Sequence, residues 1–187
     1  MVSLTTPVCD FNAPAIDFEL PDIYEKKWTL ETAKGQNGTL IAFICNHCPY
    51  IKAIVPRLVE DVRKLKDEYG INTVAIMSND QSLYDEDSTE NMIRISKEMG
   101  FSFPYLIDET QEVAKAYGAV CTPDFFGFSK DMKLQYRGRF DASRKETAPE
   151  GTRRDLFEAM KQIALTGKGP LEQIPSLGCS IKWKDSI

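Results

Sequence analysis

One short apolar run constrains the fold of this chain more than any other segment. Residues Thr39–Ile44 read Thr-Leu-Ile-Ala-Phe-Ile and follow the turn-forming segment Gly35–Gly38. Because β-branched and apolar side chains occupy both faces of this run, it predicts a strand buried inside a sheet. A chain of 187 residues is long enough to bury a core around such a strand.

Predicted strands and helices alternate after this strand. Apolar positions from Pro49 to Tyr69 recur at spacings of three and four, which predicts one amphipathic helix that Pro56 kinks without ending. The same patterns predict, in order, strand 71–78, helix 89–99, strand 103–107, helix 111–117, strands 122–128 and 134–140, and helix 153–165. This order indicates an α/β fold, a three-layer α/β/α sandwich with a central mixed sheet.

The two ends of the chain complete the predicted architecture. Alternating polarity over residues 13–22, with Trp28 and Leu30 beginning a return partner, predicts an N-terminal hairpin. No repeat or interdomain linker interrupts the sequence. We therefore expect a single domain over residues 1–187, with residues 166–187 as an extended, aperiodic C-terminal tail packed on it.

Charge and composition narrow the possible partners and location. The chain has 23 Lys+Arg and 28 Asp+Glu, a net charge of −5, which argues against non-specific binding of nucleic acid. No apolar run approaches the ~20 residues that span a bilayer, and the N-terminus does not resemble a secretory signal. We expect a cytoplasmic protein without a membrane or nucleic-acid partner. No glycine-rich phosphate loop follows a predicted strand, so no organic cofactor is expected.

The chemically distinctive segment is Cys45-Asn-His-Cys48, between the core strand and the next helix. Unpaired N–H groups at a helix N-terminus stabilise an anion, so we expect Cys45 to be a thiolate nucleophile. Two intervening residues place Cys48 within disulfide reach, where it acts as the resolving cysteine. This hypothesis depends on the Cys45 sulfur being open to water and outside a four-ligand metal cage.

The same residues also admit structural interpretations. The cysteine pair is alternatively two small buried side chains or half of a zinc site, although no other histidine is present and no third ligand has suitable spacing. His47 either stabilises the thiolate or is an exposed turn residue without a role. For Cys121, packing is favoured over trapping of oxidised Cys45. Redox roles for Cys9 and Cys179 stay open.

Strand, CxxC motif, kinked helix and the later Thr122-Pro123 together resemble the thioredoxin fold. The segments that carry a narrower resemblance are 12–22, 45–50, 103–108, 136–139 and 178–184. They are similar to the redoxin branch, which includes alkyl hydroperoxide reductases and thiol-specific antioxidant proteins. The resemblance implies that Cys45 is the exposed nucleophile, Cys48 the resolver, and Pro123 a cis-proline whose loop pairs with substrate, rather than an ordinary turn proline.

Some positions depart from these families. The peroxiredoxin pattern Pro-x-x-x-Thr-x-x-Cys meets Gly38 and Ala42 before Cys45, and thioredoxin's tryptophan before the motif is Ile44. The arginine that polarises peroxide in peroxiredoxins has two candidates, Arg137 and Arg139, for which a surface position is the commoner case. These departures argue against both a peroxidase and a generic thioredoxin function.

Three functions follow from these residues. The first is a thiol–disulfide oxidoreductase that uses the Cys45/Cys48 couple, with catalytic contributions from His47 and Pro123, on protein or small-molecule disulfides and with a thiol reductant system. The second is a thiol peroxidase that reduces hydroperoxides. The third, without catalysis, is soft-metal binding or copper delivery through Cys45, Cys48 and His47.

Overall fold

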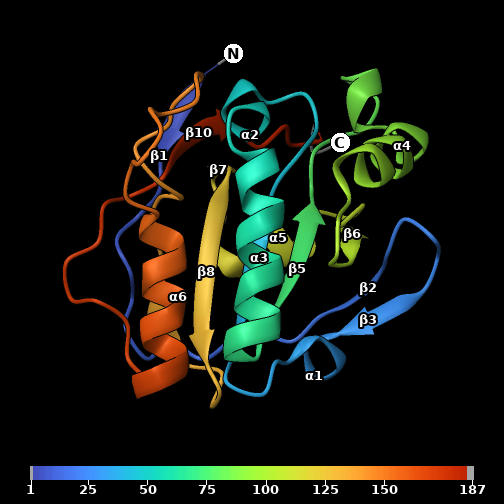
Figure 1. Cartoon of the computed structure of the whole chain (residues 1–187). Helices are drawn as coiled ribbons and strands as arrows, with labels where there is room; N and C mark the ends of the chain where they lie inside the picture. Colours follow the sequence, from blue (N-terminus) through green and yellow to red (C-terminus); the bar gives the residue numbers. More distant parts are fainter. Residues whose placement is uncertain (1, 185–187) are drawn as a thin grey trace.

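A five-stranded mixed sheet forms the centre of the computed structural model, which describes residues 2–184 (Figure 1). Its strands, in spatial order, are β6 (Tyr105–Ile107), β5 (Ile71–Met77), β4 (Gly38–Phe43), β8 (Asp124–Ser129) and β9 (Leu134–Tyr136). β4 runs parallel to β5 and antiparallel to β8. The predicted buried strand is thus the central one, and all its residues are buried.

Alternating side chains of β4 divide the core into two apolar clusters. Leu40 and Ala42 belong to the cluster that includes helices α3 (Val55–Tyr69) and α6 (Asp155–Thr166). Ile41 and Phe43 belong to the opposite cluster, which α5 (Glu112–Tyr117), α1 (Leu30–Ala33) and the hairpin of β2 (Glu19–Pro21) and β3 (Lys27–Thr29) complete. Figure 1 shows α3 and α6 side by side on one face of the sheet and α5 behind it. Helices therefore cover both faces, which confirms the predicted three-layer α/β/α architecture.

The elements of the second face and of the sheet edge are short. They are β2 (Glu19–Pro21), β3 (Lys27–Thr29), α1 (Leu30–Ala33), the 3₁₀ turn η1 (Asp85–Asp87), α4 (Thr89–Met99) and α5 (Glu112–Tyr117). The predicted N-terminal hairpin is present as β2 and β3, which pair antiparallel. Among the described residues no helix is both long enough and apolar enough to span a bilayer.

The predicted kinked helix over residues 49–69 is wrong, because the structure divides it in two. Helix α2 (Pro49–Lys52) ends at Ala53, and α3 begins at Val55. Pro56 stands in the first turn of α3, where its missing N–H costs no hydrogen bond. Inside a continuous helix its ring would collide with the carbonyl group of the preceding turn. The proline therefore starts a new helix instead of bending an existing one.

A second, three-stranded sheet joins the two ends of the chain. β10 (Leu177–Ser180) pairs antiparallel with β1 (Ser3–Thr5) on one side and with β7 (Cys121–Thr122) on the other. The tail was expected to lack regular structure, and β10 corrects that expectation. Such short strands carry no readable period, and their hydrogen-bond partners come from distant parts of the chain.

Arg137 is a third correction, since it is buried rather than exposed. Its guanidinium group donates to both carboxylate oxygens of Asp124, at 3.2 and 2.9 Å, and to the Gly118 carbonyl oxygen at 2.8 Å. Asp124 is the first residue of β8 and follows Pro123 directly. Burial raises the pKa of the Asp124 carboxyl group, and Arg137 opposes that rise. The ion pair therefore anchors the start of β8 and leaves Arg137 occupied.

We predict that Arg137→Met lowers the free energy of unfolding by about 3–5 kcal/mol, because it leaves the Asp124 charge buried without a partner. Urea unfolding measures this change. The matched double variant Arg137→Met/Asp124→Asn should recover most of the loss, because it removes both charges. Equal stability of the single variant and the wild type would contradict a structural role for the pair.

Candidate active site

Two loops that are distant in sequence form the candidate site. The first follows β4 and carries Cys45-Asn-His-Cys48, with Cys48 as the N-terminal cap residue of α2. The second connects β7 to β8 and contains the Thr122–Pro123 peptide bond, which is cis, as the resemblance implied. Because β4 and β8 are neighbours in the sheet, with Phe43 opposite Asp124, these loops leave the sheet side by side.

Thr122 contacts both sulfur atoms of the CxxC motif. The Cys45 Sγ lies 3.2 Å from the Thr122 hydroxyl oxygen, and the Cys48 Sγ lies 3.2 Å from the Thr122 carbonyl oxygen. The Cys48 Sγ also lies 2.9 Å from the Sγ of Cys179 on β10. All five cysteines fall among the described residues and are free. The structure thus shows a reduced dithiol held against the cis-proline loop.

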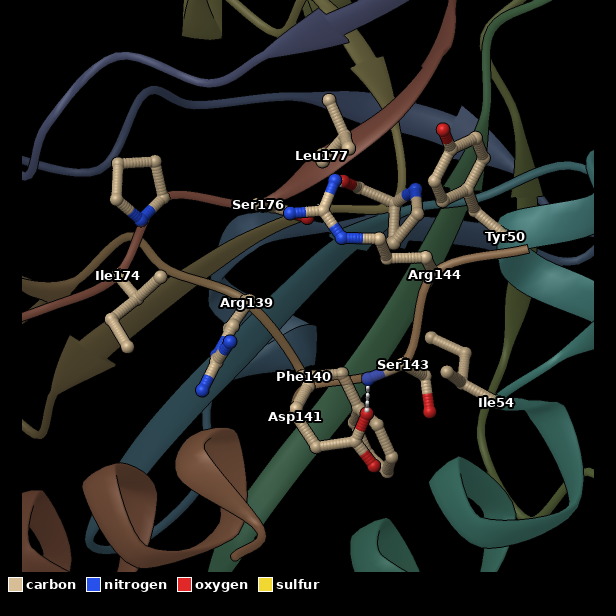
Figure 2. A pocket seen from close by; sticks show the side chains of 13 residues that line it. Tyr50, Ile54, Arg139, Phe140, Asp141, Ser143, Arg144, Ile174, Ser176 and Leu177 are labelled. Atoms are coloured by element: carbon tan, nitrogen blue, oxygen red, sulfur yellow. Dashed lines mark hydrogen bonds between the residues drawn. The ribbon is translucent and has the colours of Figure 1, made fainter. Parts of the chain in front are cut away.

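A groove borders the same loop (Figure 2). It encloses about 470 Å³, including space open to solvent, and its lining includes Tyr50, Pro123 and Leu177. Figure 2 shows the exposed Arg144 side chain reaching toward Ser176 and Leu177 at this groove. Arg144 lines this groove and forms no salt bridge with a carboxylate of residues 2–184.

The expectation of an exposed Cys45 is wrong. The exposed fraction of both Cys45 and Cys48 is 0%. The loop carrying Thr122 covers the sulfurs from one side, and the side chains that pack on Asn46 and His47 close the other. Any exchange with a substrate therefore requires part of this cover to move.

The charge of the dithiol lies on Cys48 rather than on Cys45. Burial raises the pKa of the Cys45 thiol well above its ordinary value, and the Asp87 carboxylate nearby adds to the rise. Hydrogen bonds from the Cys45 and Cys179 thiols and from the backbone N–H groups of Cys179 and Ile51 lower the pKa of Cys48 to about 5, although burial opposes them. The helix start therefore stabilises its own cap residue, and Cys45 acts as a donor to the Cys48 thiolate.

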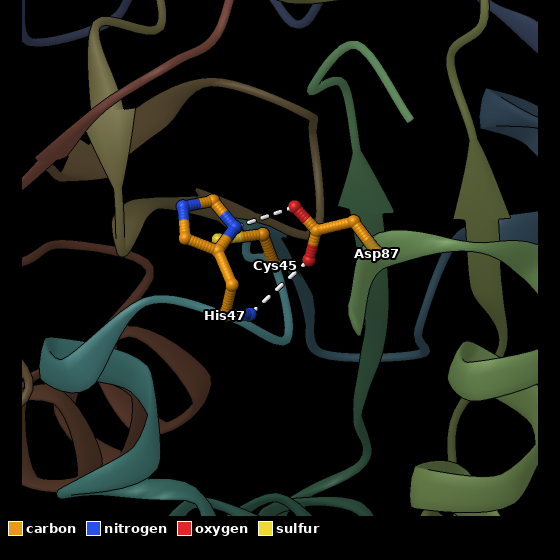
Figure 3. Close-up of side chains that lie close together, drawn as sticks. All are labelled: Cys45, His47 and Asp87. Atoms are coloured by element: carbon orange, nitrogen blue, oxygen red, sulfur yellow. Dashed lines mark hydrogen bonds and ion pairs between the residues drawn. The ribbon is translucent and has the colours of Figure 1, made fainter. Parts of the chain in front are cut away.

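His47 is paired with Asp87 beside the Cys45 sulfur (Figure 3). The His47 Nδ1 lies 2.6 Å from the Asp87 Oδ2, and both side chains are buried. Asp87 also accepts the backbone N–H groups of Asn46, at 2.8 Å, and of His47, at 3.2 Å. Burial raises the pKa of Asp87, but its hydrogen bonds, first that from His47 and then that from Asn79, outweigh it and hold the pKa below its ordinary value. His47 as an exposed turn residue is therefore excluded.

The other side of the His47 ring packs against Tyr84. The two rings are stacked, with centroids 3.9 Å apart and planes inclined by 3°. The His47 Nε2 is buried and has no hydrogen-bond partner within the described part of the chain. Nearby, Asn46 is fixed by its amide donating to the Glu86 carbonyl oxygen and by accepting the Tyr105 hydroxyl group at 3.1 Å. The segment around η1 thus holds both central residues of the motif.

A metal ion has a candidate ligand set here. One ligand atom each from Cys45, His47 and Asp87 lie within 4.8 Å of one another. This sulfur, nitrogen and oxygen set is chemically suited to zinc, but binding through the His47 Nδ1 would break its hydrogen bond to Asp87. The set differs from the predicted one, since Asp87 takes the place of Cys48.

The remaining cysteines have distinct surroundings. The Cys121 thiol is buried, donates to the Pro123 carbonyl oxygen at 3.6 Å, and has a pKa raised by burial, which supports packing. Burial raises the pKa of Cys9 to about 11. Sequence analysis missed the contacts of Asp87, Thr122 and Cys179, because no spacing connects them to the motif.

Comparison with known proteins identifies the family. The chain matches the AhpC/TSA family over residues 11–137, more than half of its length. It belongs to this family. This AhpC/TSA protein is 27% identical over 150 residues to the thiol-disulfide oxidoreductase ResA of Bacillus thuringiensis subsp. konkukian, a match that covers 80% of this chain and 76% of that protein.

Solved structures resemble this AhpC/TSA protein over most of its length. An uncharacterized conserved protein from Geobacillus kaustophilus is 42% identical, with a TM-score of 0.93, over 100% of this chain and 99% of that one. The thioredoxin domain of a thiol-disulfide oxidoreductase from Bacteroides vulgatus is 16% identical, with a TM-score of 0.61, over 82% of this chain and 97% of that one. The second likeness concerns the fold alone and confirms the predicted thioredoxin-like architecture.

We predict that the reduced AhpC/TSA protein carries one thiolate in this dithiol at neutral pH. Because hydrogen bonds lower the pKa of Cys48 to about 5, the thiolate should be present above that pH and disappear as the pH falls through it. Ultraviolet thiolate absorbance during an acid titration measures this. Cys48→Ser should abolish the transition, whereas Cys9→Ser should retain it. A wild-type transition near the ordinary thiol pKa of ~8.5 would contradict the hydrogen-bond assignment.

Proposed function

We propose that this protein is a thiol–disulfide oxidoreductase that uses Cys45 and Cys48 as its redox couple. One observation carries the proposal: two free cysteines separated by two residues both contact Thr122, whose peptide bond to Pro123 is cis. Membership of the AhpC/TSA family and the similarity to ResA support an oxidoreductase.

The chemistry is two successive exchanges. The proton that Cys45 shares with the Cys48 thiolate moves to Cys48, and the Cys45 thiolate attacks one sulfur of a substrate disulfide. A mixed disulfide forms while the first substrate sulfur leaves as a thiolate and takes the proton from Cys48, which becomes a thiolate again. Cys48 then attacks the Cys45 sulfur, and the second substrate thiolate leaves. Two electrons reach the substrate, the protein holds a Cys45–Cys48 disulfide, and a thiol reductant system restores the dithiol.

Neighbouring residues position this couple. His47 and Asp87 hold the loop that carries the motif. The Asp87 charge raises the pKa of Cys45, and it therefore also makes the Cys45 thiolate a more reactive nucleophile once the proton has moved to Cys48. The groove beside Pro123 offers a place for an extended substrate segment, and the exposed Arg144 favours an acidic one. The proposal includes a cytoplasmic location for the protein, which cell fractionation would test.

Few contacts hold the segment around η1 over the dithiol. Tyr84 stacks on His47, and the Lys52 ammonium group is paired with Glu86 at 2.8 Å. The Lys52–Glu86 pair is exposed and contributes little to stability, so this side of the cover depends mainly on the one ring contact and the Asp87 hydrogen bonds.

The proposal is tested by reduction of a model protein disulfide, such as that of insulin, by the pre-reduced protein under single-turnover conditions. Cys45→Ser and Cys48→Ser should each lower the exchange rate to that of the double variant, since neither sulfur completes the cycle alone. Cys9→Ser is the matched control and should react like the wild type. Undiminished exchange by Cys45→Ser would refute the assignment.

The same preparations separate the alternative functions. A thiol peroxidase is favoured by the Thr122 hydroxyl group beside Cys45, but Arg137 is engaged with Asp124. It would oxidise Cys45 with hydroperoxide much faster than free cysteine reacts, in stopped-flow mixing. A metal-binding protein would retain stoichiometric metal after anaerobic purification and lose it in Asp87→Asn.

We further predict that Tyr84→Ala accelerates alkylation of Cys45 by iodoacetamide in the reduced protein. Loss of the stacked ring frees His47 and loosens the segment over the sulfur. Mass spectrometry of the Cys45 peptide gives the rate, and Tyr24→Ala, at an exposed tyrosine, is the matched control. An unchanged rate would show that access to the sulfur comes from another side.

A further inference from the structure

Cys179 lies closer to the redox couple than a packing role requires. Its Sγ is 2.9 Å from the Cys48 Sγ, less than 1 Å longer than the ~2.05 Å of a disulfide bond. Cys121 is also buried, but its thiol is directed to the Pro123 carbonyl oxygen. Of the two cysteines in the three-stranded sheet, only Cys179 is directed at the dithiol.

The backbone holds Cys179 in this place. Cys179 pairs with Thr122 of β7 on one side and with Ser3 of β1 on the other, so it occupies the central strand of its sheet. A Cβ atom added at Gly178 would lie 2.1 Å from the Thr122 carbonyl oxygen. Only a glycine allows this close approach of β10 to the cis-proline loop. The position of the third sulfur is therefore built into the fold.

The charges at the three sulfurs differ in the reduced protein. Burial, together with donation to Cys48, raises the pKa of Cys179 to about 12, so Cys179 is a protonated donor while Cys48 is a thiolate. This arrangement changes on oxidation. Once Cys48 is bonded to Cys45, it no longer carries the charge that holds the Cys179 proton. Burial still raises the pKa of Cys179, and the Lys182 and Lys145 ammonium groups oppose it.

We propose that Cys179 is a third redox cysteine, which accepts the disulfide from Cys45 by exchange at Cys48. The Cys179 thiolate attacks the Cys48 sulfur, the Cys48–Cys179 bond forms, and the Cys45–Cys48 bond breaks. Cys45 leaves as a thiolate and takes up the proton that Cys179 released. The exchange needs no oxidant, because two electrons move from Cys179 to Cys45 within the protein. It rests on the proposed function, which supplies the first disulfide.

The consequence is a released nucleophile. After the exchange, Cys45 is again a free thiol while the oxidising equivalent is stored between Cys48 and Cys179. In this state the oxidised protein still attacks a partner's disulfide through Cys45, which forms a mixed disulfide and releases one partner sulfur as a thiol. A couple of only two cysteines cannot do this until it is reduced. The third sulfur thus separates the storage of the disulfide from its exchange with substrate.

Peptide mapping of disulfides after oxidation with excess oxidised glutathione and acid quenching tests the proposal. The wild type should contain both the Cys45–Cys48 and the Cys48–Cys179 species, and the control Cys121→Ser should match it. Gly178→Ala, which must shift β10 without changing any sulfur, should lower the Cys48–Cys179 fraction.

The outcomes distinguish this inference from the proposed function. If the oxidised wild type contains the Cys45–Cys48 disulfide and no Cys48–Cys179 disulfide, the third-cysteine role is overturned while the proposed function stands. If Cys179→Ser is folded but forms no Cys45–Cys48 disulfide, the proposed function itself fails. Circular dichroism of each variant establishes that it is folded before its disulfides are mapped.

Discussion

The site depends on Thr122, which contacts the CxxC motif and pairs with the strand that carries Cys179. Its hydroxyl group lies beside the Cys45 sulfur, its carbonyl oxygen lies beside the Cys48 sulfur, and its backbone pairs with Cys179 in the small sheet. These contacts depend on β7 and β10 approaching without an intervening side chain at Gly178. Because this residue contacts two sulfurs and pairs with the strand that carries the third, a shift of its loop changes all three environments together.

Burial and hydrogen bonding act in opposite directions on the same pair of thiols. Removal from water disfavours a thiolate at either cysteine, but Cys48 receives donors from two thiols and two backbone N–H groups, whereas Cys45 faces a carboxylate. Neighbouring groups therefore decide which sulfur carries the charge. The expected helix-terminus effect exists, but it acts on the cap residue Cys48, which is one turn further along the chain than the residue chosen from the sequence.

The site was partly predictable because its central motif is local. The position of Cys45 and Cys48 after a buried strand, and the cis-proline loop at Pro123, could be placed from short segments and a family resemblance. Asp87 could not, since it lies 40 residues from its partner His47 within a polar run that has no period. Nor could Cys179, which is 131 residues from Cys48 and reaches it through a strand too short to carry a pattern.

The sequence by itself determined the order of strands and helices, the central place of the Thr39–Ile44 strand, and the presence of a dithiol at its carboxyl end. Apolar periodicity and turn residues are local properties, and the sheet follows from them. Only the tertiary structure decided that the sulfurs are covered, that Asp87 pairs with His47, that Arg137 is bound to Asp124, and that a third cysteine joins the pair. Each of these depends on contacts between residues distant in the chain, whose energies arise from burial and from partners that no local pattern specifies.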